Sequence, residues 1–443
     1  MTETVTSSLL INEKIIEIEN PSVFKWNNIY LEIIKQLKNK NIIKLNLVKS
    51  TKHKLYFNVV CVDGLNSIIN KPFISQFNIQ HSTFDIRHST FANICCLIIP
   101  TGIGASFGGY AGDANPIAKV LADTNKYLLT HPNVVNGAVL SDVPNNLIYL
   151  EGYFMDQFLL GNINIIPTKQ NKIGVIFDRG INEKRLEYEI NVLNALKSFY
   201  GCHIEGYSIT KKPLTIEANI NEYGFSSGNV KNLEYVIEIA QRFKSLGITA
   251  IAICTAIPDL ELNKSYIAGS GIDPIGGIES IISRSASASC GLVCAHAPIL
   301  VRADLCVYPN IEDIDYKNIS SVSASEYIAQ TFLPSVISGL RFAPTIKDQK
   351  SKIENCFSYL DLNKVIIPYN AFGSPGVLAL SEIFENITLI KENKTSLSVD
   401  PNHLNIKFNV CSSYIEMISE EKIRELGIDP NIFKRPVEKV HQI

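Results

Sequence analysis

The stretch ICCLIIPTGIGASFGGYAGDANP, residues 94–116, decides the fold class of this 443-residue chain. It opens with a continuous apolar run over 94–99, which predicts a strand buried on both faces and ended by Pro100. Five glycines then lead into a helix predicted over 114–125. A buried strand, a glycine-rich turn and a helix in this order are typical of parallel α/β proteins.

Alternating strand and helix patterns extend from this stretch over residues 93–400. We expect an α/β fold of mainly parallel sheets covered by helices and arranged in two lobes. Pro334 should kink or split one of the predicted helices. Strands are predicted at 127–130, 172–177, 249–254, 292–295, 301–307, 365–368 and 387–391, and helices at 183–199, 230–246, 275–285, 323–340 and 376–384.

Residues 1–90 differ from the rest of the chain. They are rich in Lys, Asn and Ile, hold the single Trp, and predict a helix over 27–37 and a strand over 55–62. We interpret 1–90 as a small N-terminal α+β subdomain or cap. The remainder is predicted to divide into a first α/β lobe with the glycine-rich turn, 91–245, and a second α/β lobe, 246–443.

Composition narrows the class of protein. Hydrophobic residues make up 46% and charged residues 19%, which favours a large ordered core. With a net charge of −2 and no basic cluster, we expect no nucleic-acid partner. No apolar run approaches the roughly 20 residues of a membrane span, so no membrane partner is expected. Scattered cysteines and the absence of a signal-peptide pattern predict reduced thiols and a cytoplasmic location. The sequence leaves open whether the protein forms a homo-oligomer.

The glycine-rich turn is a candidate binding element. Glycines allow close approach of a ligand, and free N–H groups at a helix start favour an anion. The spacing matches neither the P-loop nor the dinucleotide fingerprint, so no nucleotide cofactor is indicated and the cofactor stays unknown. The alternative is a tight structural turn. The carboxylate of Asp113 is ambiguous, because it could repel an anion, cap the helix or hold a cation. The expected substrate-binding residues are Gly102, Gly104, Ser106, Gly108, Gly109 and Asp113.

Two residues that follow predicted strands are candidates for acid/base chemistry. His131 would lie where open α/β sheets bind ligands, or it could bond a loop carbonyl. Glu151 could be a general base with a raised pKa or a buried ion-pair partner. Asn133 and Asn136 could donate amide hydrogen bonds to a substrate, or serve as turn residues.

The second lobe supplies further candidates. His296 follows a predicted strand and is a second choice for acid/base work. Glu279 comes just after Gly276 and Gly277 at a predicted helix start, and all three are candidate substrate-binding residues. For Glu279 the alternative is a favourable interaction with the helix dipole.

The acid/base candidates are expected to meet in one pocket. We predict that His131, Glu151 and His296 lie together beside the glycine-rich turn. With Asp113 they could hold a divalent metal, although no compact ligand spacing supports a metal site.

Cys254 gives an alternative chemistry. It ends a predicted buried strand, which is where two-cysteine racemases keep a catalytic thiol. Such a mechanism needs a second, opposed thiol, so Cys290 or Cys294 would have to face Cys254. The other interpretation is a buried structural cysteine.

Several of these stretches together resemble the uncharacterised domain-of-unknown-function family 3326 (DUF3326), over roughly residues 90–400. The family has no assigned activity, so the resemblance implies a fold unit and site positions, with Asn370 among the substrate-binding residues, and no reaction. The stretches are the glycine-rich turn, THPNVVN (130–136), NLIYLEG (146–152), GGIE (276–279), AHAP (295–298) and the region around Asn370 and Asn393.

The sequence therefore predicts an enzyme that acts on a small carboxylate or phosphate metabolite by acid/base chemistry, as a lyase, isomerase or hydrolase. A two-cysteine racemase-like isomerase and a non-catalytic metabolite-binding regulatory protein are the alternatives.

Overall fold

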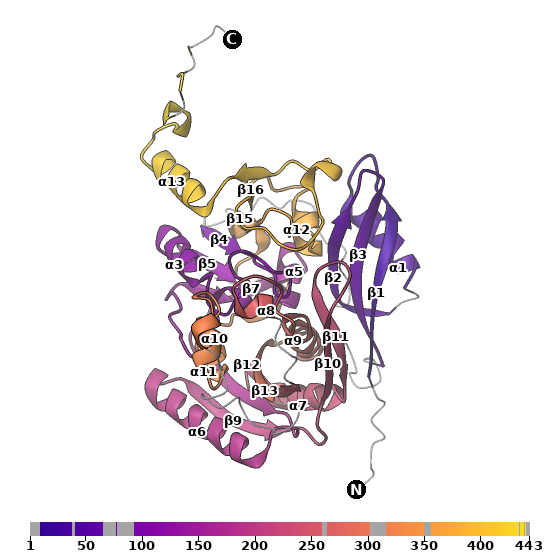
Figure 1. Cartoon of the computed structure of the whole chain (residues 1–443), viewed down its shortest axis with the longest axis vertical. Helices are drawn as coiled ribbons and strands as arrows, with labels where there is room; N and C mark the ends of the chain where they lie inside the picture. Colours follow the sequence, from indigo (N-terminus) through magenta and orange to yellow (C-terminus); the bar gives the residue numbers. More distant parts are fainter. Residues whose placement is uncertain are drawn as a thin grey trace.

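The computed structural model describes residues 9–37, 40–64, 77, 93–258, 264–301, 316–349, 356–433, 435–437 and 439. Two parallel sheets with helices on their faces form the body of the protein, which confirms the predicted fold class. Figure 1 shows one sheet above the other, with helix α9 (Gly276–Cys290) between them. No helix in the described ranges is long and apolar enough to cross a membrane.

The first sheet has six strands in the order β17-β16-β15-β4-β5-β6, and every neighbouring pair is parallel. The chain leaves β4 toward β5 on one side and β15 toward β16 on the other. The boundary between β4 and β15 is therefore a topological switch point, where open α/β sheets bind ligands. The strands are β4 (Ile94–Leu97), β5 (Tyr127–Thr130), β6 (Leu147–Tyr149), β15 (Leu362–Pro368), β16 (Ile387–Ile390) and β17 (Asn409–Cys411).

The second sheet has four parallel strands in the order β13-β12-β8-β9. The predicted boundary between residues 245 and 246 falls inside this sheet, because β8 and β9 precede it while β12 and β13 follow it. The strands are β8 (Lys172–Phe177), β9 (His203–Ile209), β12 (Ala250–Pro258) and β13 (Val293–Val301), and α6 (Glu183–Tyr200) and α7 (Glu234–Ser245) accompany them.

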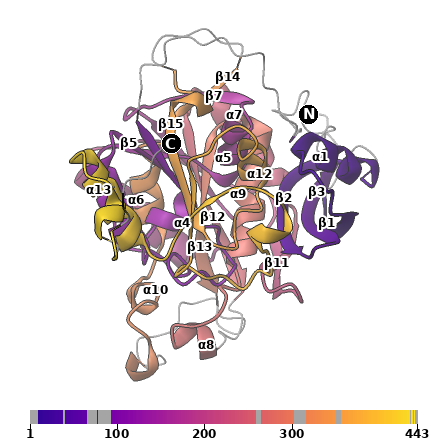
Figure 2. The same cartoon turned by 90° about the horizontal axis from the view of Figure 1, so that it is seen from above.

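The N-terminal region forms an antiparallel sheet in the order β1-β3-β2, packed beside one helix. It lies on the right in Figure 1 and beside α9 and α12 in Figure 2. Strand β2 contacts α9 directly, so this subdomain borders the space between the two parallel sheets. Its elements are β1 (Leu10–Glu19), α1 (Trp26–Lys35), β2 (Asn41–Ser50) and β3 (Lys54–Asp63).

Most predicted elements are present, although several bounds differ: the helix predicted over 275–285 extends to Cys290, and the one predicted over 376–384 ends at Leu380. The helix predicted over 230–246 begins four residues later, because 226–231 pairs with 215–220 as a hairpin. Pro334 opens a new helix and so splits the predicted 323–340 segment. A single strand, β13, spans 293–301, and the rest of the strand predicted over 301–307 lies outside the described residues.

The remaining elements connect the sheets and cover their faces. They are α3 (Asn115–Thr124), α4 (Pro132–Val135), α5 (Gly152–Leu159), β7 (Ile163–Ile166), β10 (Thr215–Ile220), β11 (Ser226–Lys231), α8 (Lys264–Ile267), α10 (Ala324–Ile328), α11 (Leu333–Leu340), β14 (Thr345–Asp348), α12 (Pro375–Leu380), α13 (Tyr414–Glu425) and the 3-10 turns at Tyr316–Asn318, Tyr359–Asp361, Pro401–His403 and Pro430–Phe433.

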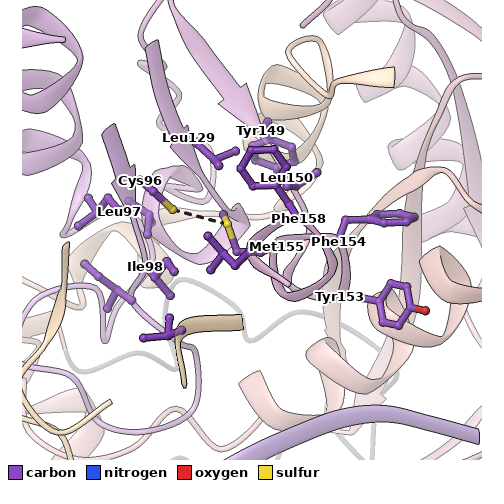
Figure 3. Close-up of a cluster of buried hydrophobic side chains, with 14 of the residues drawn as sticks. Cys96, Leu97, Ile98, Leu129, Tyr149, Leu150, Tyr153, Phe154, Met155 and Phe158 are labelled. Carbon is purple, nitrogen blue, oxygen red and sulfur yellow. Dashed lines mark hydrogen bonds between the residues drawn. The ribbon is translucent and has the colours of Figure 1, made fainter. Parts of the chain in front are cut away.

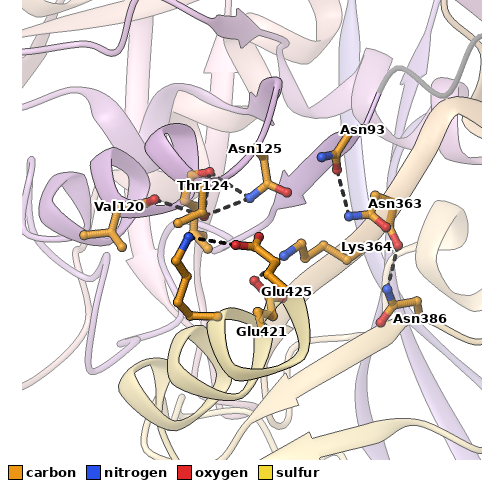
Figure 4. Close-up of polar contacts among 11 residues, drawn as sticks. Asn93, Val120, Thr124, Asn125, Asn363, Lys364, Asn386, Glu421 and Glu425 are labelled. Atoms are coloured by element: carbon orange, nitrogen blue, oxygen red, sulfur yellow. Dashed lines mark hydrogen bonds and ion pairs between the residues drawn. The ribbon is translucent and has the colours of Figure 1, made fainter. Parts of the chain in front are cut away.

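The first sheet is anchored at two places. On one side, α5 contacts β4, where Sδ of Met155 lies 3.7 Å from Sγ of Cys96 among fully buried aliphatic and aromatic side chains (Figure 3). At its amino end, Asn363 donates to Asn93, and buried Lys364 pairs with Glu421 of α13 (Figure 4). These contacts leave the carboxyl ends of the strands free to form a site.

The turn after the first sheet, the β10–β11 hairpin and the start of α9 meet at a close backbone crossing. Ser226 of β11 donates its N–H to the Gly102 carbonyl, and its hydroxyl accepts the Gly277 N–H at 2.8 Å. A Cβ at Gly277 would lie 2.0 Å from the Ser226 carbonyl oxygen, and one at Gly102 would lie 2.1 Å from its hydroxyl. Only glycine fits at either position, so this crossing fixes where α9 begins.

We expect Gly277→Ala to destabilise the protein by about 1–3 kcal/mol, because the new methyl group must displace backbone atoms. Gly206→Ala is the matched control, since a Cβ there meets no atom within 4 Å, and it should change stability by less than about 0.5 kcal/mol. Urea unfolding followed by circular dichroism measures both. Equal midpoints would contradict the proposed crossing.

Candidate active site

A cavity of about 530 Å³ lies at the carboxyl end of the first sheet, against strand β13 of the second. The segments after β4, β5 and β6 form part of its wall, and β13, α9, β2 and the α10–α11 region complete it. The structure therefore brings residues from the two parallel sheets and the N-terminal sheet to one site. Of the residues predicted from sequence, the cavity is lined by Gly109, His131, Asn133, Asn136, Glu151, Glu279 and His296.

His131 is a buried, uncharged imidazole. Its Nε2 accepts the Ile99 N–H at 3.0 Å, so the proton of the neutral ring is on Nδ1. Burial, with a smaller effect of the Arg284 charge, lowers the pKa of His131 to about 3. At neutral pH this side chain can donate a hydrogen bond into the cavity but carries no charge.

The two asparagines next to His131 already have protein partners. The Asn133 amide donates to the carbonyls of Ile99 and Gly108, both at 2.8 Å, so it ties the glycine-rich turn to α4. Asn136 accepts the Tyr149 hydroxyl at 3.1 Å through its oxygen. Asn133 is therefore a structural tie that also borders the cavity.

Glu151 caps α5 and faces the cavity. One carboxylate oxygen accepts the Tyr153 N–H at 2.7 Å, and the other accepts the Ser283 hydroxyl at 3.3 Å. Burial raises the pKa of Glu151 to about 7, while the nearby Arg284 charge opposes that shift. The carboxyl group consequently titrates near neutral pH.

His296 and Glu279 form a hydrogen-bonded pair in the cavity wall. Nδ1 of His296 lies 3.0 Å from Oε2 of Glu279, and Nε2 lies 2.8 Å from the Thr255 hydroxyl. The 3.0 Å between Nδ1 and Oε2 would suit an ion pair. However, burial lowers the pKa of His296 to about 3 and raises that of Glu279 to about 8, so both side chains are mainly uncharged at neutral pH. The side chain of Glu279 is 23% exposed and that of His296 only 2%, so the carboxyl group is the member that meets a ligand.

Arg284 and Lys44 form a cationic end of the cavity, and neither was predicted from the sequence as a site residue. Nη1 of Arg284 donates to Asp156 at 3.0 Å and to the Ile43 carbonyl at 3.3 Å. Among the described residues, the rest of the guanidinium has no hydrogen-bond partner. Burial and the charge of Arg284 lower the pKa of Lys44 to about 8, despite opposing attraction from Glu13.

Asp273 and Glu326, also missed, form an acidic end with Glu279. Burial is the main cause that raises the pKa of Asp273 to about 7 and that of Glu326 to about 8. Repulsion from Glu279 adds to both shifts, and repulsion from Asp273 adds to that of Glu326. Tyr266 donates to both oxygens of Glu326, at 2.9 and 3.0 Å. Tyr110 stacks on Tyr266 with ring centroids 4.6 Å apart.

The glycine-rich turn does not offer free N–H groups as expected. Oδ1 of Asp113 accepts the N–H of Gly108 at 2.7 Å and that of Tyr110 at 3.4 Å, and Glu326 accepts the Ala111 N–H. The protein's own carboxylates therefore occupy the positions that an anion would take. Burial raises the pKa of Asp113 to about 6.

The other members of the turn also make internal contacts. Gly102 and Gly104 adopt positive φ and would place a Cβ against Ser226 and Gly271. The Ser106 hydroxyl donates to the Lys394 carbonyl. These contacts favour the structural interpretation for most of the turn, and only its Gly109–Ala111 part reaches the cavity.

Gly276, Gly277 and Asn370 do not line the cavity. A Cβ at Gly276 would lie 2.3 Å from the Thr101 hydroxyl, so both glycines serve the backbone crossing. The amide of Asn370 donates to two carbonyls and accepts from Thr395, which closes a loop after β15. None of these three residues contacts the cavity. The two glycines position the start of α9, and Asn370 holds the loop after β15.

Neither Cys290 nor Cys294 faces Cys254. Cys254 packs on one face of the second sheet with Ala250 and Ala252, whereas Cys294 packs on the other face. Cys290 lies 3.7 Å from Cys294, also away from Cys254. Burial raises the pKa of Cys254 well above its usual range, and this side chain does not reach the cavity. Among the described residues, the two cysteines proposed as partners of Cys254 are therefore not placed for a two-cysteine mechanism.

Within the described ranges, no group of three His, Cys, Asp or Glu side chains is placed to hold a metal ion. The predicted combination of His131, His296, Asp113 and Glu151 is therefore not assembled as a metal site.

The family profile described as "Protein of unknown function (DUF3326)" matches residues 94–434. This chain is a DUF3326 protein. An uncharacterized lipoprotein of Synechococcus sp. is 32% identical over 339 residues, which cover 75% of this chain and 91% of that relative. No solved structure matches the chain. The predicted resemblance is thus confirmed, and strand β2 with Lys44 lies outside the matched range of the DUF3326 profile.

One sequence signal could have revealed part of the missed site. In α9, Glu279 and Ser283 are four residues apart, as are Ser280 and Arg284, so all four lie on one helix face. An Arg on the same face as a Glu, in a helix otherwise built of small and aliphatic residues, indicates a polar site. No comparable pattern marks Lys44, because its strand comes from a different subdomain.

The raised pKa of Glu326 predicts a pH effect on the stability of this DUF3326 protein. The native state holds a proton on Glu326 up to about pH 8, whereas an unfolded chain releases it near its ordinary value of 4.5. The contribution of Glu326 to stability should therefore fall as pH rises through this window. Glu326→Gln, which stays neutral, should gain thermal stability relative to wild type between pH 5 and pH 8.5.

Exposed Glu425→Gln is the control and should show no such gain. A constant difference in melting temperature between Glu326→Gln and wild type across the pH range would show that Glu326 is ionised throughout.

Proposed function

We propose that this DUF3326 protein is an enzyme that performs acid/base chemistry on a small anionic metabolite, a carboxylate or a phosphate. The observation that carries the proposal is one face of α9, which presents a titrating carboxyl group, Glu279, and a cation, Arg284, to the same cavity. A binding group and a proton-transfer group on one rigid helix keep a fixed mutual geometry.

Arg284 is the proposed anion-binding residue. Its ion pair with Asp156 and its bond to the Ile43 carbonyl hold the guanidinium in place through Nη1. Its remaining N–H groups suit a planar carboxylate or a phosphate, which guanidinium binds through two parallel hydrogen bonds. Lys44 adds a second positive charge at the same end of the cavity.

The Glu279–His296 pair is the proposed proton carrier. A catalytic acid or base works best when its pKa lies near the working pH, and burial places Glu279 there. When Glu279 loses its proton to a base or a substrate, His296 can offer Nδ1–H to the carboxylate while Nε2 accepts from Thr255. Glu151, with a pKa of about 7, is available as the second acid/base group.

The supported reaction classes are those that move a proton at or beside a carbonyl: isomerisation, lyase chemistry and hydrolysis. The substrate is proposed as the partner, with no role for nucleic acid. A cytoplasmic location belongs to this proposal as well, and the lipoprotein designation is that of the Synechococcus relative.

Anion binding can be tested with Arg284→Lys, which keeps the charge but loses the fork of N–H groups. Arg185→Lys is the matched control, because Arg185 pairs with buried Glu189 at 2.6 Å and does not line the cavity. A bound anion at 100 times its Kd should stabilise wild type by about 2.7 kcal/mol in thermal shift. We expect the affinity for phosphate or a small carboxylate to fall about tenfold in Arg284→Lys only. An equal loss in both variants would refute the assignment.

Proton transfer can be tested by solvent exchange. We expect wild type to introduce deuterium from D₂O into a carbon-bound position of at least one small carboxylate or phosphate ester, as followed by proton NMR. Glu279→Gln should slow this exchange by at least about 100-fold while ligand affinity changes little. Glu425→Gln should behave as wild type. A ligand that binds yet never exchanges would support the regulatory-protein alternative instead.

A further inference from the structure

Among the residues that the structure describes, the acidic end of the cavity has no cation of its own. Asp273, Glu279 and Glu326 come from the segment before α9, from α9 and from α10. Within the described part of the chain, no Lys or Arg lies within 4.0 Å of their carboxylates, and Glu279 has only the largely uncharged His296. Three carboxyl groups thus share a buried space, in which Glu279 disfavours ionisation of Asp273, and both disfavour ionisation of Glu326.

The hydroxyl of Tyr110 is a second, independent observation that points to a bound ligand at this end. The side chain of Tyr110 is only 6% exposed, and its hydroxyl is buried with no hydrogen-bond partner among the described atoms. Buried hydroxyls are almost always bonded, so an unbonded one needs an explanation. Tyr110 lines the cavity and stacks on Tyr266, the donor to Glu326, which places it at the acidic end.

The geometry favours an organic cation over a metal ion. A divalent metal needs several oxygen ligands within about 2.0–2.6 Å, and no such convergent group is present in the described ranges. An ammonium group is larger and donates up to three hydrogen bonds, so separated carboxylates and a hydroxyl can share it. The stacked rings of Tyr110 and Tyr266 add aromatic faces, which also attract a cation.

The opposite end of the same cavity is cationic. Arg284 and Lys44 act on each other electrostatically, and Arg284 also acts on Glu151 and His131. Along α9, Glu279 and Arg284 are five residues apart, which corresponds to a rise of about 7.5 Å. One small molecule can therefore reach both ends.

We infer that the substrate is a zwitterion of the amino-acid class, whose ammonium group binds between Asp273, Glu279 and Glu326 while its anionic group binds Arg284 and Lys44. This inference rests on the proposed function and adds the identity of the second charged group. It also assigns a role to the N-terminal subdomain, because Lys44 of β2 helps to select the anionic group.

The arrangement places the proton carrier beside the carbon that bears the amino group. Glu279 belongs to the ammonium site and to the pair with His296 at the same time. An ammonium bound there stabilises the ionised carboxylate, which is the form that accepts a proton. The carbon next to the ammonium is consequently the expected position of proton removal.

Matched probe pairs test the inference: alanine with propanoate, glutamate with glutarate, and 4-aminobutanoate with butanoate. Each pair differs by one amino group. In calorimetry at pH 8, we expect wild type to bind the aminated member of at least one pair at least tenfold more tightly than its partner. The double variant Asp273→Asn/Glu326→Gln should lose this preference, yet bind the deaminated member within about threefold of wild type.

Folding of the double variant is checked by circular dichroism, and Glu425→Gln is the control that should keep the preference. Equal affinities within every pair, or a preference that survives in the double variant, would overturn the inference. If wild type binds magnesium or calcium ions and the double variant does not, the acidic end is a metal site and the inference of an ammonium site is wrong. If no probe of any pair binds, and Arg284→Lys and Arg185→Lys also behave alike, the proposed function fails together with the inference.

Discussion

The close approach of three backbone segments at Gly102, Ser226 and Gly277 is the constraint on which the site depends. The turn after the first sheet, the hairpin beside the second sheet and the start of α9 touch there, with no room for a side chain at either glycine. Because α9 is rigid, fixing its first turn also fixes Glu279 and Arg284. The chemistry of the cavity is thus set by a contact that contains none of its charged groups.

Burial then determines the electrostatics of the cavity. Glu151, Asp273, Glu279 and Glu326 all have a raised pKa, with loss of hydration as the largest cause in each case. Four carboxyl groups held near the midpoint of their titration are a cost to folding rather than a gain. Groups perturbed in this way, gathered in one cleft, are typical of functional sites rather than of structural ion-pair networks.

The sequence allowed the prediction of residues whose position follows from local pattern. His131 and Glu151 come just after strands of the first sheet, and parallel strands bring their carboxyl ends together, whereas His296 lies inside β13 and reaches the cavity from the second sheet. Lys44 and Glu326 could not be predicted, because they reach the cavity only through packing of segments far apart in sequence. The glycine-rich turn was misjudged as an open anion site for a related reason: one carboxylate, Asp113, folds back onto it.

The strand order of the first sheet has a consequence for how the chain folds during synthesis. β4 pairs with β15, so Cys96 and Val365 are neighbours although about 270 residues separate them. The edge of β4 in the half-sheet of β4, β5 and β6 stays unpaired until β15, about 270 residues later, has been synthesised. Such late closure predicts slow folding, and it leaves an apolar edge strand that a chaperone or a second nascent chain can meet first.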